Sequence, residues 1–157
     1  MHKLGVIGTA RKENERRVPI HPEHLPRLAE RLRKQLVFEQ GYGAPFGVSD
    51  DVLAAQSGGV APRHELLKSL GRVVLPKPVV SDLEELKEGG LLWGWPHCVQ
   101  QQALTQVAID RKQTLVAFED MFVWGPGGNM GRHTFYKNNE MAGYCAVLHA
   151  LQLKGID

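Results

Sequence analysis

The chain has 157 residues, of which 43% are hydrophobic and 23% are charged, a composition typical of one globular domain and not of a disordered chain. No apolar run approaches the ~20 residues of a membrane helix. The N-terminal residues also lack the apolar region and cleavage site of a secretory signal. We therefore expect a cytoplasmic protein with no membrane partner.

The net charge of +2 is unevenly distributed, because residues 1–40 hold nine Lys and Arg against five Asp and Glu, and the remainder holds ten against twelve. A nucleic-acid-binding protein usually has a larger and more continuous basic stripe. We expect no nucleic-acid partner, and instead a local site for a small anion. Cys98 and Cys145 are far apart and form no CxxC pair, so we expect free thiols and no metal site.

The first quarter of the chain is predicted to form a strand, a helix and a strand. Residues 3–8 (KLGVIG) and 36–40 (LVFEQ) have the apolar pattern of buried strands. The segment between them, residues 22–34, is predicted to be a helix because four apolar side chains recur at helical spacing: Leu25, Leu28, Ala29 and Leu32.

The same alternation continues through residue 120. The further predicted strands are 72–76, 91–95 and 114–120. The further predicted helices are 50–56 with Ser49 as N-cap, 63–71 closed by Gly71, 80–90 with Ser81 as N-cap, and 99–112.

Strands that alternate with helices predict an α/β fold: an open, mostly parallel, flavodoxin- or Rossmann-like sheet with helices on both faces. Residues 121–135 are predicted to add a hairpin arm, and residues 139–155 a long C-terminal helix. We expect residues 1–157 to form a single domain. Folds of this class bind ligands beyond the carboxyl ends of their strands, so the residues after each strand are the candidates for function.

Arg17 follows the first predicted strand, where its guanidinium can bind a carboxylate through two parallel hydrogen bonds. The alternative is a surface arginine paired with Glu13 or Glu15. Arg16 is the weaker candidate, because neighbouring residues in an extended segment point in opposite directions.

Lys77, between two prolines, follows the third predicted strand, and His97 follows the fourth. A lysine there can bond a keto oxygen or a carboxylate, and an imidazole can act as a general acid or base. The alternatives are a solvated loop lysine and a histidine of a helix start. Glu119 lies near the fifth strand. Trp93 and Trp95 share one strand face, for which core or interface packing is the default.

Six motifs in order resemble the alanine dehydrogenase and transhydrogenase N-terminal domain family over essentially the whole chain. They are KLGVIGTARKENERRVPIHPEHL, FEQGYGAPFGVSDD, LPKPV, WGWPHCV, VAFEDM and YKNNEMAG. The resemblance implies that Arg17 binds the carboxylate of a keto acid. It implies that Lys77 contacts the keto acid or imine and assists proton transfer, that His97 is the general acid/base, and that Glu119 lies near the substrate.

Within this family the chain looks most like the carboxyethylornithine synthases, and saccharopine dehydrogenase is a related member. The resemblance implies an oxidoreductase that joins pyruvate to the side-chain amine of ornithine or lysine, reduces the imine with NADPH or NADH, and forms a homo-oligomer. Two alternatives remain: a fragment of an alanine dehydrogenase-type enzyme, and a non-enzymatic module that binds keto or amino acids. Asn138 and Asn139 before Glu140, the tryptophan-rich strand and the 121–135 arm depart from the alanine dehydrogenase pattern.

The sequence contains no GxGxxG motif and no recognisable ribose-binding acid. We therefore predict that residues 1–157 form a substrate-binding, catalytic domain with no cofactor-binding residues, and that the dinucleotide-binding domain of the family is absent from this chain. On this interpretation the chain alone gives no turnover.

Overall fold

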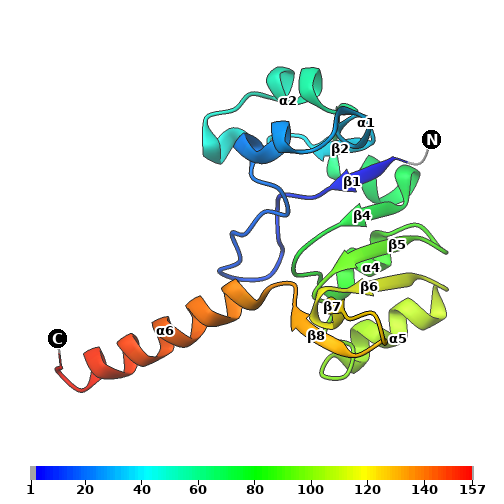
Figure 1. Cartoon of the computed structure of the whole chain (residues 1–157). Helices are drawn as coiled ribbons and strands as arrows, with labels where there is room; N and C mark the ends of the chain where they lie inside the picture. Colours follow the sequence, from blue (N-terminus) through cyan, green and yellow to red (C-terminus); the bar gives the residue numbers. More distant parts are fainter. Residues whose placement is uncertain (1–2, 157) are drawn as a thin grey trace. The chain divides into compact units, whose positions relative to one another are not determined.

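The computed structural model describes residues 3–156. Contacts within the chain divide it into two compact units, the first ending at Phe118 and the second beginning at Glu119. Each unit is described by itself, with the element labels of Figure 1.

The first unit is built on a six-stranded sheet with the order β3-β2-β1-β4-β5-β6, in which every neighbouring pair is parallel (Figure 1). This confirms the predicted open parallel sheet. The strands are β1 (Leu4–Val6), β2 (Leu36–Glu39), β3 (Val60–Ala61), β4 (Arg72–Val74), β5 (Leu91–Gly94) and β6 (Thr114–Ala117). The sequence did not predict β3, because two residues are too short to produce a periodic pattern.

The strand order reverses after β1: the chain runs outward through β2 and β3, then returns to place β4 on the other side of β1. Right-handed crossovers in opposite directions put the connecting helices on opposite faces of the sheet. The helical elements of this unit are η1 (Pro22–Arg27), α1 (Glu30–Arg33), η2 (Ala44–Phe46), α2 (Asp50–Gln56), α3 (Arg63–Glu65), the π-helix η3 (Leu66–Leu70), α4 (Val80–Glu85) and α5 (Gln102–Asp110).

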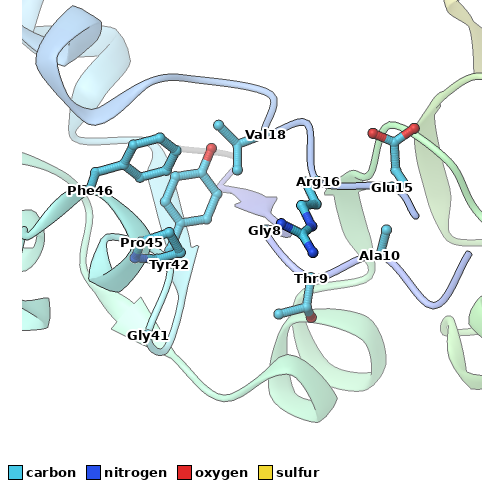
Figure 2. Close-up of a pocket in the computed structure, with 10 residues that line it drawn as sticks. All are labelled: Gly8, Thr9, Ala10, Glu15, Arg16, Val18, Gly41, Tyr42, Pro45 and Phe46. Atoms are coloured by element: carbon cyan, nitrogen blue, oxygen red, sulfur yellow. The ribbon is translucent and has the colours of Figure 1, made fainter. Parts of the chain in front are cut away.

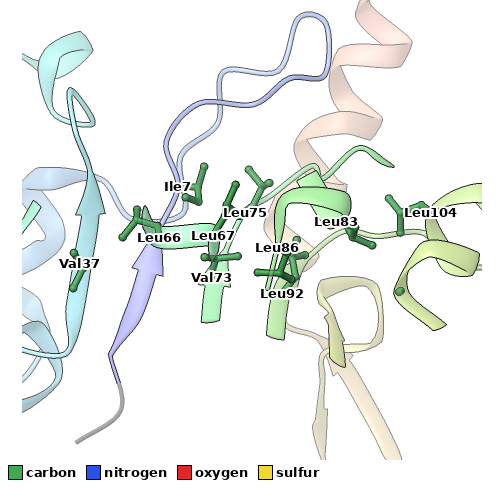
Figure 3. Packing of buried hydrophobic residues seen from close by; sticks show 11 residues of the cluster. Ile7, Val37, Leu66, Leu67, Val73, Leu75, Leu83, Leu86, Leu92 and Leu104 are labelled. Carbon is green, nitrogen blue, oxygen red and sulfur yellow. The ribbon is translucent and has the colours of Figure 1, made fainter. Parts of the chain in front are cut away.

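The main core lies where η3, α4 and α5 pack on β4 and β5 (Figure 3). Leucine dominates it, because leucines, which are good helix formers, on the helices meet leucine and valine side chains on the strands. Its fully or almost fully buried members are Ile7, Leu66, Leu67, Val73, Leu75, Leu83, Leu86, Leu92 and Leu104.

The predicted helix over residues 22–34 is interrupted in the structure. A 3₁₀ helix ends at Arg27, Leu28 and Ala29 are extended with ψ near 140°, and α1 then provides a single turn. Pro26 lies inside the 3₁₀ helix and has no N–H to donate to the Pro22 carbonyl, so a regular α-helix cannot run through this segment.

Two of the three predicted helix caps are confirmed. Ser49 Oγ accepts the Val52 N–H, and Gly71 ends η3 with a left-handed φ of 66°. Ser81 is not the cap of α4. The buried carboxylate of Asp82 accepts the Val79 N–H at 2.9 Å instead, so an acid inside the first turn performs the capping.

The second unit contains the predicted hairpin and C-terminal helix. Strands β7 (Phe122–Trp124) and β8 (Met130–His133) pair antiparallel, and the turn between them is closed by Gly125 N–H donating to the Asn129 carbonyl. The 3₁₀ helix η4 (Phe118–Asp120) precedes the hairpin, and α6 (Tyr136–Leu153) starts three residues earlier than predicted.

Candidate functional site

The candidate site lies where the strand order reverses. Strands β1 and β4 are neighbours there, and β5 is next to β4. The loops that leave the carboxyl ends of these three strands carry Arg17, Lys77 and His97 respectively. This is the position at which open α/β sheets bind ligands.

Lys77 and His97 are in direct contact, with Nζ 2.7 Å from Nε2. Both side chains are half-buried. At this distance one nitrogen donates a hydrogen to the lone pair of the other, so a lysine ammonium and an imidazolium cannot both be present in the contact. The contact is short enough for a proton to pass between the two side chains, as an acid–base pair requires.

The backbone holds both members of this pair rigidly. Lys77 lies between the buried Pro76 and Pro78, and the Pro76 carbonyl accepts the Trp95 N–H at 2.8 Å. His97 has a left-handed φ of 50°, which is uncommon for a residue with a side chain. Its carbonyl accepts two N–H groups from the following turn, and these bonds stabilise that conformation.

Arg17 forms a bidentate pair with Glu15: its Nε donates to Oε1 at 2.8 Å and its Nη2 to Oε2 at 2.5 Å. The Arg17 backbone N–H also donates to Oε1. This guanidinium, through its hydrogen bonds first, lowers the pKa of Glu15 from 4.5 to about 2, and the carboxylate in turn raises the pKa of Arg17. One of the two alternatives from sequence, an arginine paired with Glu15, is thus what the structure shows for the Nε–Nη2 edge of Arg17.

Trp95 joins Arg17 to the lysine–histidine pair. The Arg17 Cζ and the Lys77 Nζ each lie 5.1 Å from the centre of a Trp95 ring, a distance at which a cation is attracted to an indole. The Trp95 ring also meets the buried Phe118 edge-on at 4.7 Å. The packing role expected for Trp95 is present, but the ring also serves as a platform for two cations.

A cavity of about 440 Å³ lies beside this cluster (Figure 2). Arg16 lines it and Arg17 does not, so the two neighbouring arginines diverge as strand alternation predicts. Arg16, the weaker candidate from sequence, is exposed and lines this cavity. The lining residues are Gly8, Thr9, Ala10, Glu15, Arg16, Val18, Gly41, Tyr42, Pro45 and Phe46.

A buried polar network, which sequence reasoning missed, anchors the loop after β1. The Glu39 carboxylate at the end of β2 accepts the N–H groups of Gly8 and Thr9, both at 2.8 Å. Arg63 contacts Glu39 at 3.4 Å and Asp82 at 2.7 Å. The available signal was an acidic residue at the end of an apolar strand, with a glycine two residues later.

The same network bears on cofactor binding. In a dinucleotide-binding sheet, the free N–H groups of the loop after the first strand bind the pyrophosphate. Here the N–H groups of Gly8 and Thr9 are bonded to the Glu39 carboxylate, whose charge would repel a phosphate. This loop does not fit a dinucleotide.

Glu119, the remaining predicted site residue, begins the second unit. It is half-buried, and its carbonyl oxygen lies 3.2 Å from His133 Nε2. Its contact with substrate stays a prediction. Among residues 3–156, no cluster of three or more His, Cys, Asp or Glu side chains is arranged to hold a metal ion, and no helix is long and apolar enough to cross a membrane.

The fold and this cluster define an α/β domain with a lysine–histidine pair and an arginine at the switch point of its sheet. Residues 6–124 match the family model of the alanine dehydrogenase/PNT N-terminal domain, and the chain belongs to this family. Its relatives are dehydrogenases and synthases of the oxidoreductase class.

Relatives of known name agree with this assignment. The N(5)-(carboxyethyl)ornithine synthase of Clostridium botulinum is 27% identical over 98% of this chain and 50% of its own length. Alanine dehydrogenase 2 of Staphylococcus aureus is 30% identical over 72% of this chain and 31% of its own. A solved L-alanine dehydrogenase has the same fold, with a TM-score of 0.61 and 21% identity over 81% of this chain and 34% of its own. The chain spans about half the length of the curated carboxyethylornithine synthases it matches.

Proposed function

We propose that this chain is the substrate-binding, proton-transferring half of an NAD(P)-dependent oxidoreductase that condenses pyruvate with the side-chain amine of ornithine or lysine. The observation that carries the proposal is the 2.7 Å contact between Lys77 Nζ and His97 Nε2, beside an arginine that shares the Trp95 platform. The similarity to carboxyethylornithine synthase over 98% of the chain supports the choice of substrates.

In this proposal Arg17 binds the pyruvate carboxylate. Glu15 occupies the Nε–Nη2 edge of the guanidinium and fixes its orientation, which leaves Nη1 and the second Nη2 hydrogen for the substrate. Arg17 remains accessible, because 47% of its side chain is exposed. The carboxylate of pyruvate would bind a guanidinium that is already held in place, so the arginine side chain loses little conformational entropy on binding.

Lys77 and His97 then manage the protons of the condensation. The substrate amine attacks the carbonyl carbon of pyruvate, the carbonyl oxygen takes a proton from Lys77, and the nitrogen returns one of its protons to the lysine–histidine pair to give a neutral carbinolamine. His97 then protonates the hydroxyl group as the C–O bond breaks, and the nitrogen returns its remaining proton to the pair, so that water leaves and a neutral imine forms. Because the two nitrogens are in contact, the proton lost from one can be replaced from the other.

We further propose that the reducing cofactor, NADPH or NADH, binds a dinucleotide-binding domain outside these residues, and that the complete enzyme works as a cytoplasmic homo-oligomer. Glu119 is proposed to contact the substrate. An alanine dehydrogenase-type activity is the second candidate, favoured by the 30% identity to alanine dehydrogenase 2, and it differs in using ammonia as the amine.

The test has two parts. Pyruvate binding to the chain is followed by Trp fluorescence, since Trp95 lies against Arg17 and Lys77. We expect saturable binding that Arg17→Gln weakens at least tenfold. The chain is also joined to the C-terminal half of the Clostridium botulinum synthase, and NADPH and NADH oxidation is measured with pyruvate plus ornithine, lysine or ammonia. If NADPH or NADH is oxidised with ammonia but not with ornithine or lysine, the proposed condensation with an amino-acid side chain is rejected and an alanine dehydrogenase-type activity is favoured.

A further inference from the structure

Arg16 lines the cavity, and no described acidic side chain forms an ion pair with its guanidinium. Among residues 3–156, the Arg16 side chain has no ion pair and no hydrogen bond, whereas Arg17 next to it is bidentate with Glu15. Figure 2 shows the Arg16 side chain beside Gly8 and Thr9. An arginine that lines a concave surface without a partner has five N–H donors available for an anion.

The wall opposite Arg16 is apolar and rigid. The rings of Tyr42 and Phe46 form it together with Pro45 and Val18 (Figure 2). The Tyr42 hydroxyl donates to the Ile20 carbonyl at 2.7 Å and accepts the Ile20 N–H at 3.0 Å, so two hydrogen bonds fix the hydroxyl end of the ring. The cavity therefore suits a ligand with a carboxylate at one end and a short aliphatic chain.

Glu15 connects this cavity to the cluster of Arg17, Lys77 and His97. It lines the cavity, but its carboxylate points away from Arg16 and bonds Arg17. Glu15 thus contacts both the cavity and the arginine of the proposed pyruvate site.

We infer that this cavity binds the amino-acid co-substrate by its α-carboxylate, with Arg16 as the carboxylate-binding residue and the Tyr42–Phe46 wall along the aliphatic chain. The inference rests on the proposed function, because only a two-substrate condensation requires a second carboxylate site beside the first. It names Arg16 as the residue that distinguishes a diamino acid from ammonia as the amine, since ammonia has no carboxylate to bind.

Titration of the chain with L-ornithine and with 1,4-diaminobutane tests the inference, because the diamine keeps both amines and lacks the carboxylate. Binding is measured by calorimetry in the presence of saturating pyruvate. Arg16→Gln is expected to raise the Kd for L-ornithine by about 10- to 100-fold and to leave the Kd for the diamine unchanged within threefold. Arg16→Lys should bind L-ornithine more tightly than Arg16→Gln does, since lysine keeps the positive charge but cannot form the two parallel hydrogen bonds of a guanidinium.

Two outcomes would overturn it: an unchanged Kd for L-ornithine in Arg16→Gln, or an equal loss for L-ornithine and the diamine. A loss of pyruvate affinity in the same variant would assign Arg16 to the keto-acid site and also reject the inference. Pyruvate binding to the wild-type chain, and its dependence on Arg17, is the separate readout of the proposed function. A failure there is distinguishable from a failure of the second site. Far-UV circular dichroism checks that both Arg16 variants are folded.

Discussion

Lys77 Nζ and His97 Nε2 lie 2.7 Å apart although their residues are twenty positions apart in sequence and follow different strands. The parallel pairing of β4 with β5 produces this contact, because it brings the carboxyl ends of the two strands to one edge of the sheet. In the proposed function the two nitrogens share one proton, so removing either side chain should disable both.

His97→Ala in the active enzyme is expected to lower kcat by about two to four orders of magnitude, the usual contribution of a positioned general acid. Lys77→Met should lower it by a similar factor, and the double variant should lose little more than either single one, since the residues act together. Steady-state kinetics on the chimera with pyruvate and ornithine measures this. His64→Ala is the matched control, because His64 is exposed and far from the pair in sequence. Fully additive losses would contradict a shared proton.

The sequence placed Lys77 and His97 at one edge of the sheet, because strand ends in a parallel sheet converge, and that rule requires only correct strands. It did not predict their direct contact. It did not predict that Glu15 occupies one edge of Arg17, although Glu15 was one of two candidate partners. It also did not predict that Arg16 lines a cavity. Both features depend on the path of an irregular loop, for which no periodic signal exists.

The Glu39–Arg63–Asp82 network was missed for a different reason. Its members come from the ends of β2, α3 and α4, and only the crossovers of the folded sheet bring them together. Charged residues are almost never buried without a partner, so a buried acid at a strand end indicates a partner without identifying it. The Asp82 cap, which replaces the expected Ser81, is part of the same network.

Arg63→Gln is expected to destabilise the chain by about 3–5 kcal/mol, because it leaves the buried carboxylates of Glu39 and Asp82 without their shared cation. The Arg63 side chain is only 16% exposed, so water replaces the lost contacts poorly. Urea unfolding followed by circular dichroism measures the change. Arg27→Gln, at an exposed position, is the control and should stay within about 0.5 kcal/mol of wild type. Equal effects from the two variants would contradict a structural role for the network.

The Glu15–Arg17 pair predicts a specific loss of stability in acid. The pKa of Glu15 falls from 4.5 to about 2 on folding, so the pair stabilises the native state above pH 4.5, and this contribution is lost as the pH falls from 4.5 to 2. Because Arg17 is half-exposed, solvent reduces the contribution to about 1 kcal/mol.

Urea unfolding at pH 7 and at pH 3 measures that loss. Glu15→Gln should be less stable than wild type at pH 7 and should show a smaller decrease between the two values. Glu13→Gln is the matched control, since Glu13 is an exposed acid two residues away and should behave as wild type. The prediction is wrong if Glu15→Gln and wild type lose the same free energy between pH 7 and pH 3.

The close approach of β4 and β5 behind the lysine–histidine pair depends on Gly94. A Cβ at Gly94 would lie 2.0 Å from the Leu75 carbonyl oxygen, a backbone atom that cannot move without displacing Pro76 and Lys77. No side chain can be added there unless the two strands separate. The spacing of the strands, and with it the contact between Lys77 and His97, therefore depends on the absence of a side chain at position 94.

Gly94→Ala is thus expected to cost about 3 kcal/mol or more in unfolding free energy, as overpacking against backbone does. It should also weaken pyruvate binding to whatever folded protein remains, since Lys77 moves with the strand. Gly125→Ala is the control: its Cβ would lie 3.7 Å from the Asn129 carbonyl oxygen, an ordinary contact, and its φ is not in the left-handed region. Urea unfolding and Trp fluorescence titration with pyruvate compare the two. A Gly94→Ala chain with wild-type stability and affinity would show that the strands can separate without disturbing the pair.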